Sequence, residues 1–336
     1  MSIPASIRTS TASLYPRLTQ LRKTLHEPRI KTMALESIRQ RNALLDTVFY
    51  DVGCIAKHEA EWLSPWLARE GSIVVVPPSG GPDLRVWSSA GEFLAAGGDM
   101  VNTVVVAGVG SSALGAAAFA RNVADFTGKP VAAIVSGYGL ADVLTEAMGG
   151  WFWFGMLNSM RHLFENLDEA TRFPQPQADL TRLSRDTATL VTLLRDRRFK
   201  PTLIAGHSKG NLVISEALYA LTAAHPKLAE EHAARCDVVT ISARIGMPRP
   251  FSSVIDIIGQ YDAFGALNSR PDIAPELVVA NAWHSTNKEF AWSMGLDVTQ
   301  ALRHVADQLG GAAASRSRAW RPAMADVPQL MTAALA

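Results

Sequence analysis

The sequence predicts an α/β protein in which a mostly parallel sheet is flanked by helices. The first observation is a series of short, continuous apolar runs, mostly rich in valine and isoleucine, which suit strands buried on both faces. The second is that helical patterns lie between several of these runs. The predicted strands are "SIVVVPP" (72–78), "NTVVVAGVG" (102–110), "PVAAIVSGYG" (130–139), "PTLIAGHS" (201–208), "CDVVTISAR" (236–244), "SSVIDIIGQYD" (252–262) and "ELVVANAWH" (276–284). The predicted helices are 111–126, 179–196, 211–224 and 289–309.

The pattern divides the chain into four parts. Residues 1–70 have the apolar spacing of helices and form a helical N-terminal segment, either packed on the rest of the protein or a cap of their own. Residues 71–310 hold the alternating strands and helices. An aromatic-rich insertion at about 140–178 interrupts that alternation. Residues 311–336 begin as a glycine- and alanine-rich linker and form a tail.

Composition and charge exclude some classes of protein. The formal net charge of +1 over 336 residues gives no strong field for nucleic acid or an anionic membrane. No window reaches about 18 uncharged apolar residues, so no transmembrane helix is expected. The two cysteines, Cys54 and Cys236, are expected as free thiols in a reducing compartment. We therefore expect a cytoplasmic protein.

The segment "GHSKG" is the strongest chemical motif of the chain. It places Ser208 between Gly206 and Gly210, after the strand "TLIA" and before the helix "NLVISEALYAL". A serine on such a sharp strand-to-helix turn is held in strained backbone, and close packing leaves no room for side chains two residues away. The N-terminus of the following helix directs its N–H groups to the place where negative charge develops. The motif predicts a nucleophilic serine.

Over roughly residues 72–309 the chain resembles the α/β-hydrolase superfamily, and "GHSKG" is similar to the motif of lipases and esterases, including the class 3 lipases. The resemblance implies a serine hydrolase that acts through an acyl-enzyme, with triad residues in the order Ser, acid, His. Asp262 follows the predicted strand that ends at Gly259, and His284 follows the strand that ends near Ala282. Both lie at strand exits, where catalytic groups of α/β proteins gather. We therefore expect Ser208 as nucleophile, His284 as general base and Asp262 as the acid that orients it.

Other acids and histidines fit these roles less well. Five of them are expected to be structural. Asp256 lies inside a strand, Asp237 at the opposite end of the sheet, and His304 in a helical pattern. The other two, His225 and His232, lie in a segment that looks solvated. His207 precedes the nucleophile, so its side chain should point away from the site.

The resemblance also implies an oxyanion hole made of two backbone N–H groups. One donor should be Lys209, the residue after the nucleophile. The second should come from the loop after "NTVVVAG", where Val109, Gly110 and Ser111 are the candidates. This loop lacks the "HGGG"-type run of some esterases, and the choice among the three stays open.

The insertion concentrates aromatic residues around glycines, with Trp151, Phe152, Trp153, Phe154 and Met156 at its centre. Such a cluster is typical of a buried core. It also suits a lid or an acyl-binding wall, and both interpretations stand together. On the second interpretation these five residues bind the substrate.

Three motifs point elsewhere. "GVGSSA" (108–113) matches a dinucleotide fingerprint, but no acid stands at the exit of the next strand, so we expect no cofactor. "STNK" (285–288) has no "SDN" or "KTG" partner, which argues against a β-lactamase-like site. "KHEAE" (57–61) lacks the spacing of a zinc site, and no metal is expected.

These observations predict a carboxylic ester hydrolase that acts on a hydrophobic acyl substrate, such as a lipid, an aryl ester or an intracellular polyester. A thioesterase or acyltransferase is the alternative among enzymes, because a triad does not choose its leaving group. A non-catalytic binding protein with a hydrolase fold is the alternative from another class. The basic N-terminal segment is a hypothetical docking element for a lipid or polymer surface.

Overall fold

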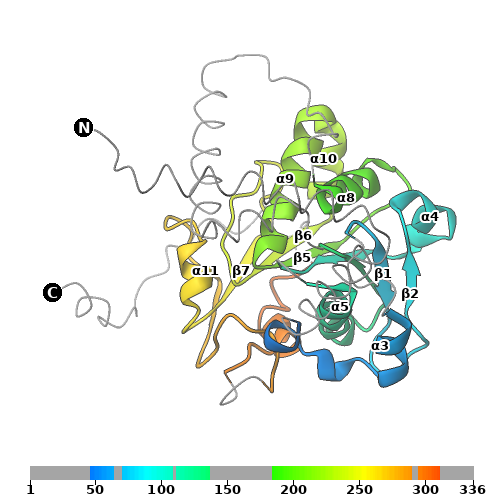
Figure 1. The fold of residues 1–336 in the computed structure, drawn as a ribbon. Coiled ribbons are helices and arrows are strands. Elements are labelled where there is room, and N and C mark those ends of the chain that lie inside the picture. Colours follow the sequence, from blue (N-terminus) through cyan, green and yellow to red (C-terminus); the bar gives the residue numbers. More distant parts are fainter. Residues whose placement is uncertain (1–45, 64–69, 109–110, 137–183, 290–293, 311–336) are drawn as a thin grey trace, which may run out of the picture.

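The structure is a computed structural model, and it describes residues 46–63, 70–108, 111–136, 184–289 and 294–310. An eight-stranded sheet runs through these residues, with helices on both of its faces (Figure 1). The strand order across the sheet is β2-β1-β4-β3-β5-β6-β7-β8. The strands are β1 (Ile73–Val76), β2 (Arg85–Trp87), β3 (Thr103–Val106), β4 (Val131–Ile134), β5 (Leu203–His207), β6 (Asp237–Ile241), β7 (Val254–Gly259) and β8 (Leu277–Val279).

The sheet is mixed but mostly parallel. From β4 to β8 each strand is parallel to its neighbour in the sheet, with Val105 beside Ala133 on one side and beside Ala205 on the other. Strand β1 is antiparallel to both β2 and β4. The predicted α/β class and its mostly parallel sheet are confirmed. The carboxyl ends of the parallel strands meet at one edge of the sheet, where side chains from distant parts of the sequence come together.

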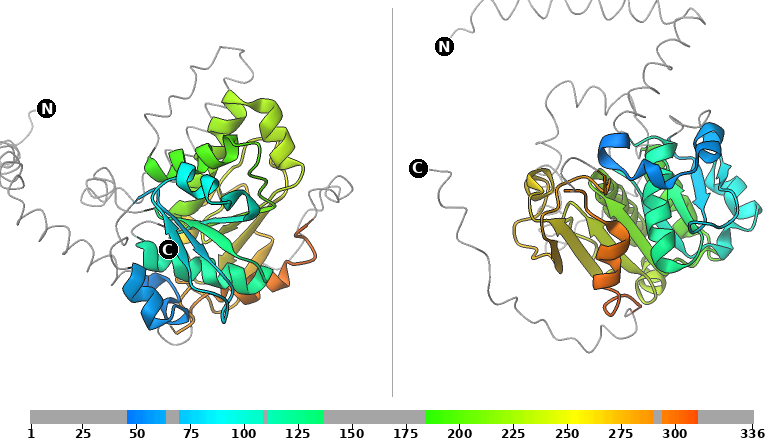
Figure 2. Two further views of the ribbon diagram at one scale, coloured as in Figure 1. Left: turned by 90° about the vertical axis from the view of Figure 1, so that its right-hand side faces the viewer. Right: turned by 90° about the horizontal axis from the view of Figure 1, so that it is seen from below.

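Two hydrophobic cores fill the spaces between the sheet and its helices. Successive side chains of a strand point to opposite faces, so Val105 packs into one core and its neighbours Val104 and Val106 into the other. Helices α5 (Ala113–Thr127) and α12 (Val298–His304) cover the first face, together with η1 (Val52–Cys54) and α3 (Lys57–Leu63) (Figure 2). The second face is covered by α4 (Ala90–Ala95), α8 (Arg185–Arg195), α9 (Lys209–Ala224) and α10 (Pro226–Ala233). The remaining short elements are η3 (Gly98–Met100) and α11 (Ala263–Leu267).

Six of the seven predicted strands are short parallel elements, and "SIVVVPP" became the antiparallel β1. Strand β2 was not predicted, because its residues Arg85–Trp87 are only partly buried and too few to show a pattern. The helix predicted over 289–309 is wrong at both ends. The observed helix α12 begins after Asp297, whose side chain accepts from the N–H of Gln300 at 2.9 Å, and it ends at His304. In the described residues just before α12, the backbone N–H of Leu296 instead donates to the carbonyl of Ser285 at 2.7 Å, a hydrogen bond that a helix does not make.

The N-terminal part of the described chain is tied to the sheet domain by a buried ion pair. Arg121 of α5 donates to Glu59 of α3 at 2.6 Å, with about 5% and 7% of the two side chains exposed. Both cysteines are free thiols, as predicted. None of the helices in the described ranges combines the length and the apolar character needed to cross a bilayer. The predicted insertion at about 140–178, the tail 311–336 and residues 1–45 lie outside the described residues.

Candidate active site

Three of the residues singled out in the sequence meet at the carboxyl edge of the sheet. Ser208 follows β5, Asp262 follows β7, and His284 lies beyond β8. The His284 Nε2 atom is 2.9 Å from the Ser208 hydroxyl, and the His284 Nδ1 atom is 2.8 Å from Asp262 Oδ1. The three side chains thus form one hydrogen-bonded row that begins at the serine.

Ser208 is held in a backbone conformation that few residues other than glycine adopt. Its φ is 53° and its ψ is −122°, and Lys209 directly after it begins α9. The neighbouring glycines explain how this turn closes. A Cβ at Gly206 would lie 2.3 Å from Asn211 Oδ1, and a Cβ at Gly210 would lie 2.0 Å from the carbonyl oxygen of Val106. The turn therefore requires glycine on both sides of the serine, the reason proposed from the sequence.

The proton positions in the row follow from the chemistry of its ends. A carboxylate can only accept, so the His284 Nδ1 atom carries the proton that is donated to Asp262. The Nε2 atom then has a free lone pair, which accepts from the Ser208 hydroxyl. Asp262 Oδ1 also accepts from the backbone N–H of Gly265 at 2.6 Å, which fixes the carboxylate at the start of α11. Only about 3% of Asp262 and 4% of His284 are exposed, so these bonds lie in a medium of low dielectric.

The expected oxyanion donors are placed only in part. Lys209 is the first residue of α9, so its backbone N–H belongs to the turn that carries Ser208. Ser111 is buried, but its backbone N–H donates to the carbonyl of Gly108 at 3.3 Å. Val109 and Gly110 lie outside the described residues. The choice of the second donor therefore stays a prediction.

The helix that follows this loop is capped by an acid that sequence reasoning missed. The carboxylate of Asp46 accepts from the N–H of Gly115 at 3.1 Å, and from both the N–H and the hydroxyl of Ser112, the N-cap of α5. Burial raises the pKa of Asp46 to about 7, against the lowering effect of these hydrogen bonds. The "GVGSSA" segment thus presents its helix N-terminus to a carboxylate of this chain, in the place where a dinucleotide fingerprint would bind phosphate.

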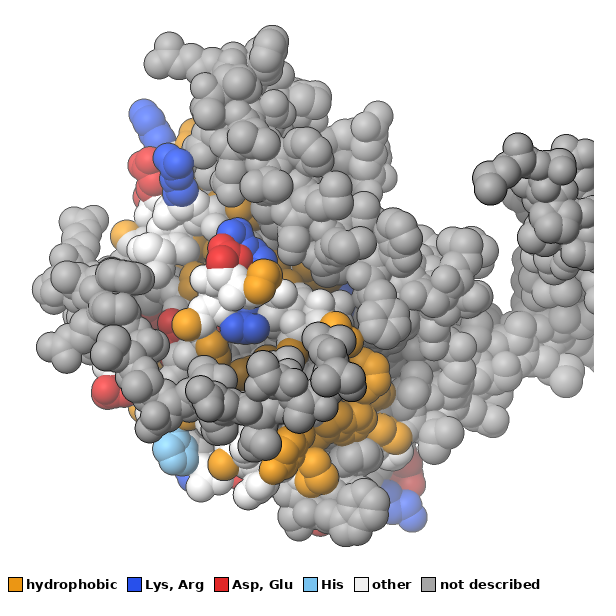
Figure 3. Space-filling view, turned by 90° about the vertical axis from the view of Figure 1, so that its left-hand side faces the viewer, with side chains coloured by type: hydrophobic (Ala, Val, Ile, Leu, Met, Phe, Trp, Pro, Cys, Tyr) orange, Lys and Arg blue, Asp and Glu red, His pale blue; other side chains and the backbone are white. Residues whose placement is uncertain are grey.

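Three aromatic rings lie next to the ring of His284. Phe49, Phe264 and Trp283 each have a ring centroid within about 6.5 Å of the His284 ring, and Phe264 is 44% exposed. Phe49 also stacks on Trp283 at 6.2 Å. Figure 3 views the molecule from the side of α11 and shows hydrophobic side chains gathered on part of that face. His284, whose Nε2 atom is hydrogen-bonded to Ser208, therefore lies beside three aromatic rings.

The alternative acids and histidines have structural partners. Asp256, whose pKa burial raises to about 7, is bonded to Thr240, and Asp237 accepts from Ser253 at 2.5 Å at the other end of the sheet. The Nε2 atom of His232 is 2.8 Å from the carbonyl of Leu194. His225 lies between α9 and α10, and His304 is exposed on α12. These five residues are thus separate from the row of Ser208, His284 and Asp262.

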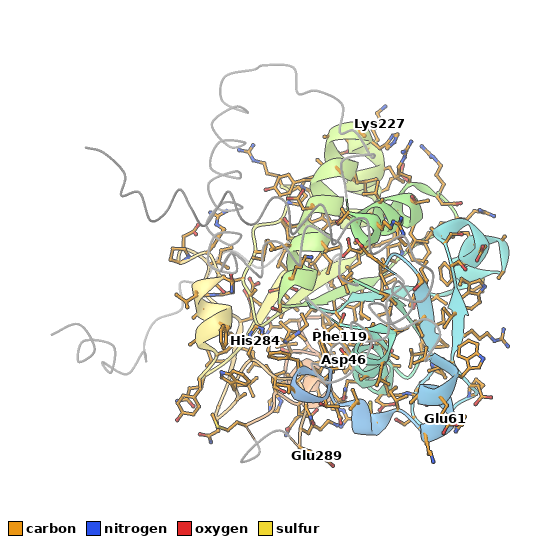
Figure 4. The ribbon with its side chains drawn as sticks, in the orientation of Figure 1. Asp46, Glu61, Phe119, Lys227, His284 and Glu289 are labelled. Atoms are coloured by element: carbon orange, nitrogen blue, oxygen red, sulfur yellow. The ribbon has the colours of Figure 1, made fainter. Side chains whose placement is uncertain are left out.

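His207 lies closer to the site than expected. Its side chain was expected to point away from the site, but its ring centroid is 5.1 Å from that of His284. The Nδ1 atom of His207 is also 3.0 Å from the hydroxyl of Tyr50, a residue that no pattern in the sequence singled out, because 157 positions separate the two. The Phe119 ring of α5, labelled in Figure 4 with Asp46 and His284, has its centroid 6.1 Å from that of His207.

In the described ranges, no three His, Cys, Asp or Glu side chains gather as metal ligands. The predicted substrate-binding residues Trp151, Phe152, Trp153, Phe154 and Met156 lie outside those ranges. No protein-family model, curated protein or solved structure matches this chain. A serine in strained backbone, hydrogen-bonded to a histidine that a buried carboxylate orients, is an arrangement that can deliver a nucleophilic oxygen and accept its proton.

Proposed function

We propose that this chain is a serine hydrolase of the α/β-hydrolase type that cleaves carboxylic esters with a hydrophobic acyl group. The observation that supports it most is the bonded row from Ser208 through His284 to Asp262, with 2.9 and 2.8 Å between its members. The order Ser, Asp, His along the chain is that of α/β-hydrolases. The positive φ of Ser208 at a strand-to-helix turn agrees with a nucleophile elbow.

In the first half of the proposed reaction, the Ser208 oxygen forms a bond to the ester carbonyl carbon while His284 Nε2 takes the serine proton. The negative charge that develops on the carbonyl oxygen is stabilised by backbone N–H groups at the start of α9 and in the loop after β3. The bond to the alcohol oxygen then breaks, and His284 returns the proton to the departing alcohol. An acyl-enzyme on Ser208 remains.

In the second half, water takes the place of the alcohol. His284 removes a proton from the water as its oxygen attacks the acyl carbon, and then protonates Ser208 as the carboxylic acid leaves. Asp262 keeps its charge throughout and stabilises the imidazolium that forms twice in each cycle.

The preference for a hydrophobic acyl group is supported by the aromatic rings beside His284. Phe264 is 44% exposed although it packs on both Trp283 and His284, so it offers an apolar face next to the reacting groups. Burying an acyl chain on that face removes apolar surface of both partners from water, which favours binding.

The test is the hydrolysis of p-nitrophenyl esters from acetyl to palmitoyl, with thioesters of the same acyl groups alongside. We expect wild type to turn over, and Ser208→Ala to lose about 10⁶-fold in kcat, the loss typical of a removed nucleophile. Ser252→Ala, which changes an exposed serine in the loop before β7, is the matched control and should stay active.

A fluorophosphonate probe gives a second readout that does not depend on the choice of ester. The probe should label wild type at Ser208, as located by peptide mass spectrometry, and should leave Ser208→Ala unlabelled. Equal, slow ester and thioester turnover by both proteins, together with no labelling, would contradict the proposal and would favour a binding protein.

A further inference from the structure

We infer that Tyr50 and His207 form a hydrogen-bonded chain that fixes the position of His284 relative to the loop after β3, and that Tyr50 is a positioning residue of the site. The role of this chain in catalysis rests on the function proposed above. The hydrogen-bonded chain itself is a property of the fold, and it can be tested separately.

The chain has three links that join distant parts of the sequence. The backbone N–H of Gly108, just after β3, donates to the Tyr50 hydroxyl at 2.5 Å. The same hydroxyl is 3.0 Å from Nδ1 of His207, at the end of β5. The Nε2 atom of His207 is 2.9 Å from the carbonyl oxygen of His284. The loop after β3 and the backbone of His284 are thus connected through two side chains.

The chemistry of its two ends allows one arrangement of protons along this chain. The carbonyl oxygen of His284 can only accept, so Nε2 of His207 carries a proton. In neutral His207, Nδ1 is then an acceptor, and the Tyr50 hydroxyl donates a hydrogen bond to it. The phenol oxygen of Tyr50 is left to accept from Gly108. Each link donates in the same direction, from Gly108 toward His284.

Because these hydrogen bonds are buried, the loss of any one of them is costly. Tyr50 is 2% exposed and His207 is 1% exposed, so a link that is removed cannot be replaced by bulk water. Burial, with a smaller effect of nearby His284, lowers the pKa of His207 to about 3, which keeps its ring neutral near neutral pH. Burial also raises the pKa of Tyr50 well above its usual value, so the phenol keeps its proton.

The segment that carries Tyr50 is itself anchored on both sides of the site. On one side, Asp46 holds the N-terminus of α5. On the other, the carbonyl of Phe49 accepts from the N–H of Thr286 at 2.9 Å, and the carbonyl of Val48 accepts from the hydroxyl of Ser285 at 2.6 Å. The backbone next to Tyr50 is therefore held in place, and so is the side chain that contacts Gly108 and His207.

Gly108 is the point where this chain reaches the nucleophile. A Cβ built on Gly108 would lie 3.0 Å from the Tyr50 hydroxyl and 3.1 Å from Cβ of Ser208. A shift of Gly108 away from Tyr50 would therefore change the distance between Ser208 and the loop expected to supply an oxyanion donor. A misplacement of about 1 Å can cost roughly 10²-fold in rate.

The first test measures the protonation and chemical shifts of the histidine ring nitrogens by NMR of the whole protein with ¹⁵N-labelled imidazoles. The variants are wild type, Tyr50→Phe and Tyr261→Phe, which removes the hydroxyl of a 51% exposed tyrosine. Signals are assigned with His207→Gln and His284→Gln. In wild type we expect His207 with its proton on Nε2 throughout pH 5–9. In Tyr50→Phe the His207 Nδ1 nitrogen and the His284 Nδ1 proton should both change their shifts, whereas Tyr261→Phe should match wild type.

The second test reads the consequence for catalysis with p-nitrophenyl butyrate. Tyr50→Phe should lower kcat by about 10²-fold with little change in KM, because positioning and not substrate binding is altered. His207→Gln retains an N–H group that reaches toward the His284 carbonyl and should keep more activity than His207→Met, which has none. This pair also decides the question if Tyr50→Phe fails to fold.

The two tests fail in different ways. Unchanged His207 and His284 signals in folded Tyr50→Phe would overturn the inference, whatever the activity of the protein. Equal kcat for His207→Gln and His207→Met would overturn the positioning role. Wild type that hydrolyses no ester, while Tyr50→Phe shifts both histidine signals, would overturn the proposed function and leave the hydrogen-bonded chain in place.

Discussion

The backbone of Gly210 lies directly against the carbonyl oxygen of Val106, because a Cβ added to this glycine would be 2.0 Å from that oxygen. This contact joins the first turn of α9 to the end of β3, and it lies between the serine turn and the loop expected to hold the oxyanion. The geometry of the site therefore depends on Gly210 having no Cβ atom.

We predict that Gly210→Ala destabilises the protein by about 3 kcal/mol, at the upper end of the usual cost of overpacking, because backbone and not a flexible side chain blocks the new methyl group. Gly91→Ala is the control, since its Cβ would meet only Ser89 Oγ at 4.0 Å within α4. Alanine should raise helix stability there by up to about 1 kcal/mol. Urea unfolding of both variants measures this, and equal midpoints would contradict the prediction.

The second prediction concerns the acid of the row. Asp262→Asn should lower kcat by about 10⁴-fold, because an amide N–H in place of Oδ1 faces His284 Nδ1 and favours the wrong tautomer. Asp256→Asn is the matched control, since Asp256 lies within β7, where its side chain is hydrogen-bonded to Thr240 and takes no part in the row of Ser208, His284 and Asp262.

Ester turnover with a folded-state check by circular dichroism measures both variants. A similar loss of kcat in Asp256→Asn and Asp262→Asn would contradict the prediction, because it would give Asp262 no larger role in turnover than a buried aspartate outside the row.

The third prediction concerns the aromatic surface. Phe264→Ala should lower kcat/KM for long-chain or aryl esters by about 10-fold, the effect of one lost aromatic contact, and should change acetyl ester turnover much less. Met100→Ala, which truncates a residue 85% exposed just before β3, should leave both values unchanged. Steady-state kinetics over the ester series gives the ratio. An equal drop for acetyl and palmitoyl esters would show that Phe264 does not contact the acyl group.

The sequence was sufficient for features whose cause is local. The strands were predictable because continuous valine runs suit positions buried on both faces, as in β3 with Val104 and Val105. The serine turn was predictable because its glycines and its flanking strand and helix lie within one short stretch. Asp262 and His284 could be selected because strand exits share one edge of a parallel sheet.

Other features depend on contacts that no local pattern encodes. The link between Tyr50 and His207 spans 157 positions. The sequence before α12 has apolar spacing, but a Cβ on Gly295 would lie 1.8 Å from the carbonyl oxygen of Asn287, so Gly295 packs against the chain beyond His284. In such places tertiary packing overrides helical periodicity.

The fourth prediction follows from the lowered pKa of His207, from 6.5 to about 3. Above pH 6.5 this ring is neutral in both folded and unfolded chains, so it has no effect on stability. Below pH 6.5 the unfolded chain binds a proton that the folded chain does not, and the free energy of unfolding falls until the pH reaches about 3. Between pH 7.5 and pH 5 this group should remove about 2 kcal/mol.

Guanidinium unfolding at these two pH values measures the effect. His207→Gln should show a smaller loss of stability toward pH 5 than wild type. His304→Gln, which replaces an exposed histidine on α12, should lose as much as wild type. The same loss in all three proteins would contradict a neutral, buried His207.

The last prediction concerns Asp46, whose effect on stability changes with pH in the direction opposite to that of His207. Burial raises the pKa of Asp46 from 3.8 to about 7, so between these values the folded chain holds a proton that the unfolded chain has released. The contribution of Asp46 to stability therefore falls as pH rises from about 4 to 7 and stays constant above. Asp46→Asn removes this dependence, although it also weakens the cap of α5 by an amount that does not vary with pH.

The quantity to measure is the difference in unfolding free energy between Asp46→Asn and wild type at pH 5 and pH 8. It should shift in favour of the variant by about 3 kcal/mol at the higher pH. Asp83→Asn, at an exposed carboxylate paired with His58, should show no such shift. A difference that stays the same at both pH values would mean that Asp46 is ionised in the folded protein already at pH 5, and that the hydrogen bonds from Ser112 and Gly115 outweigh its burial.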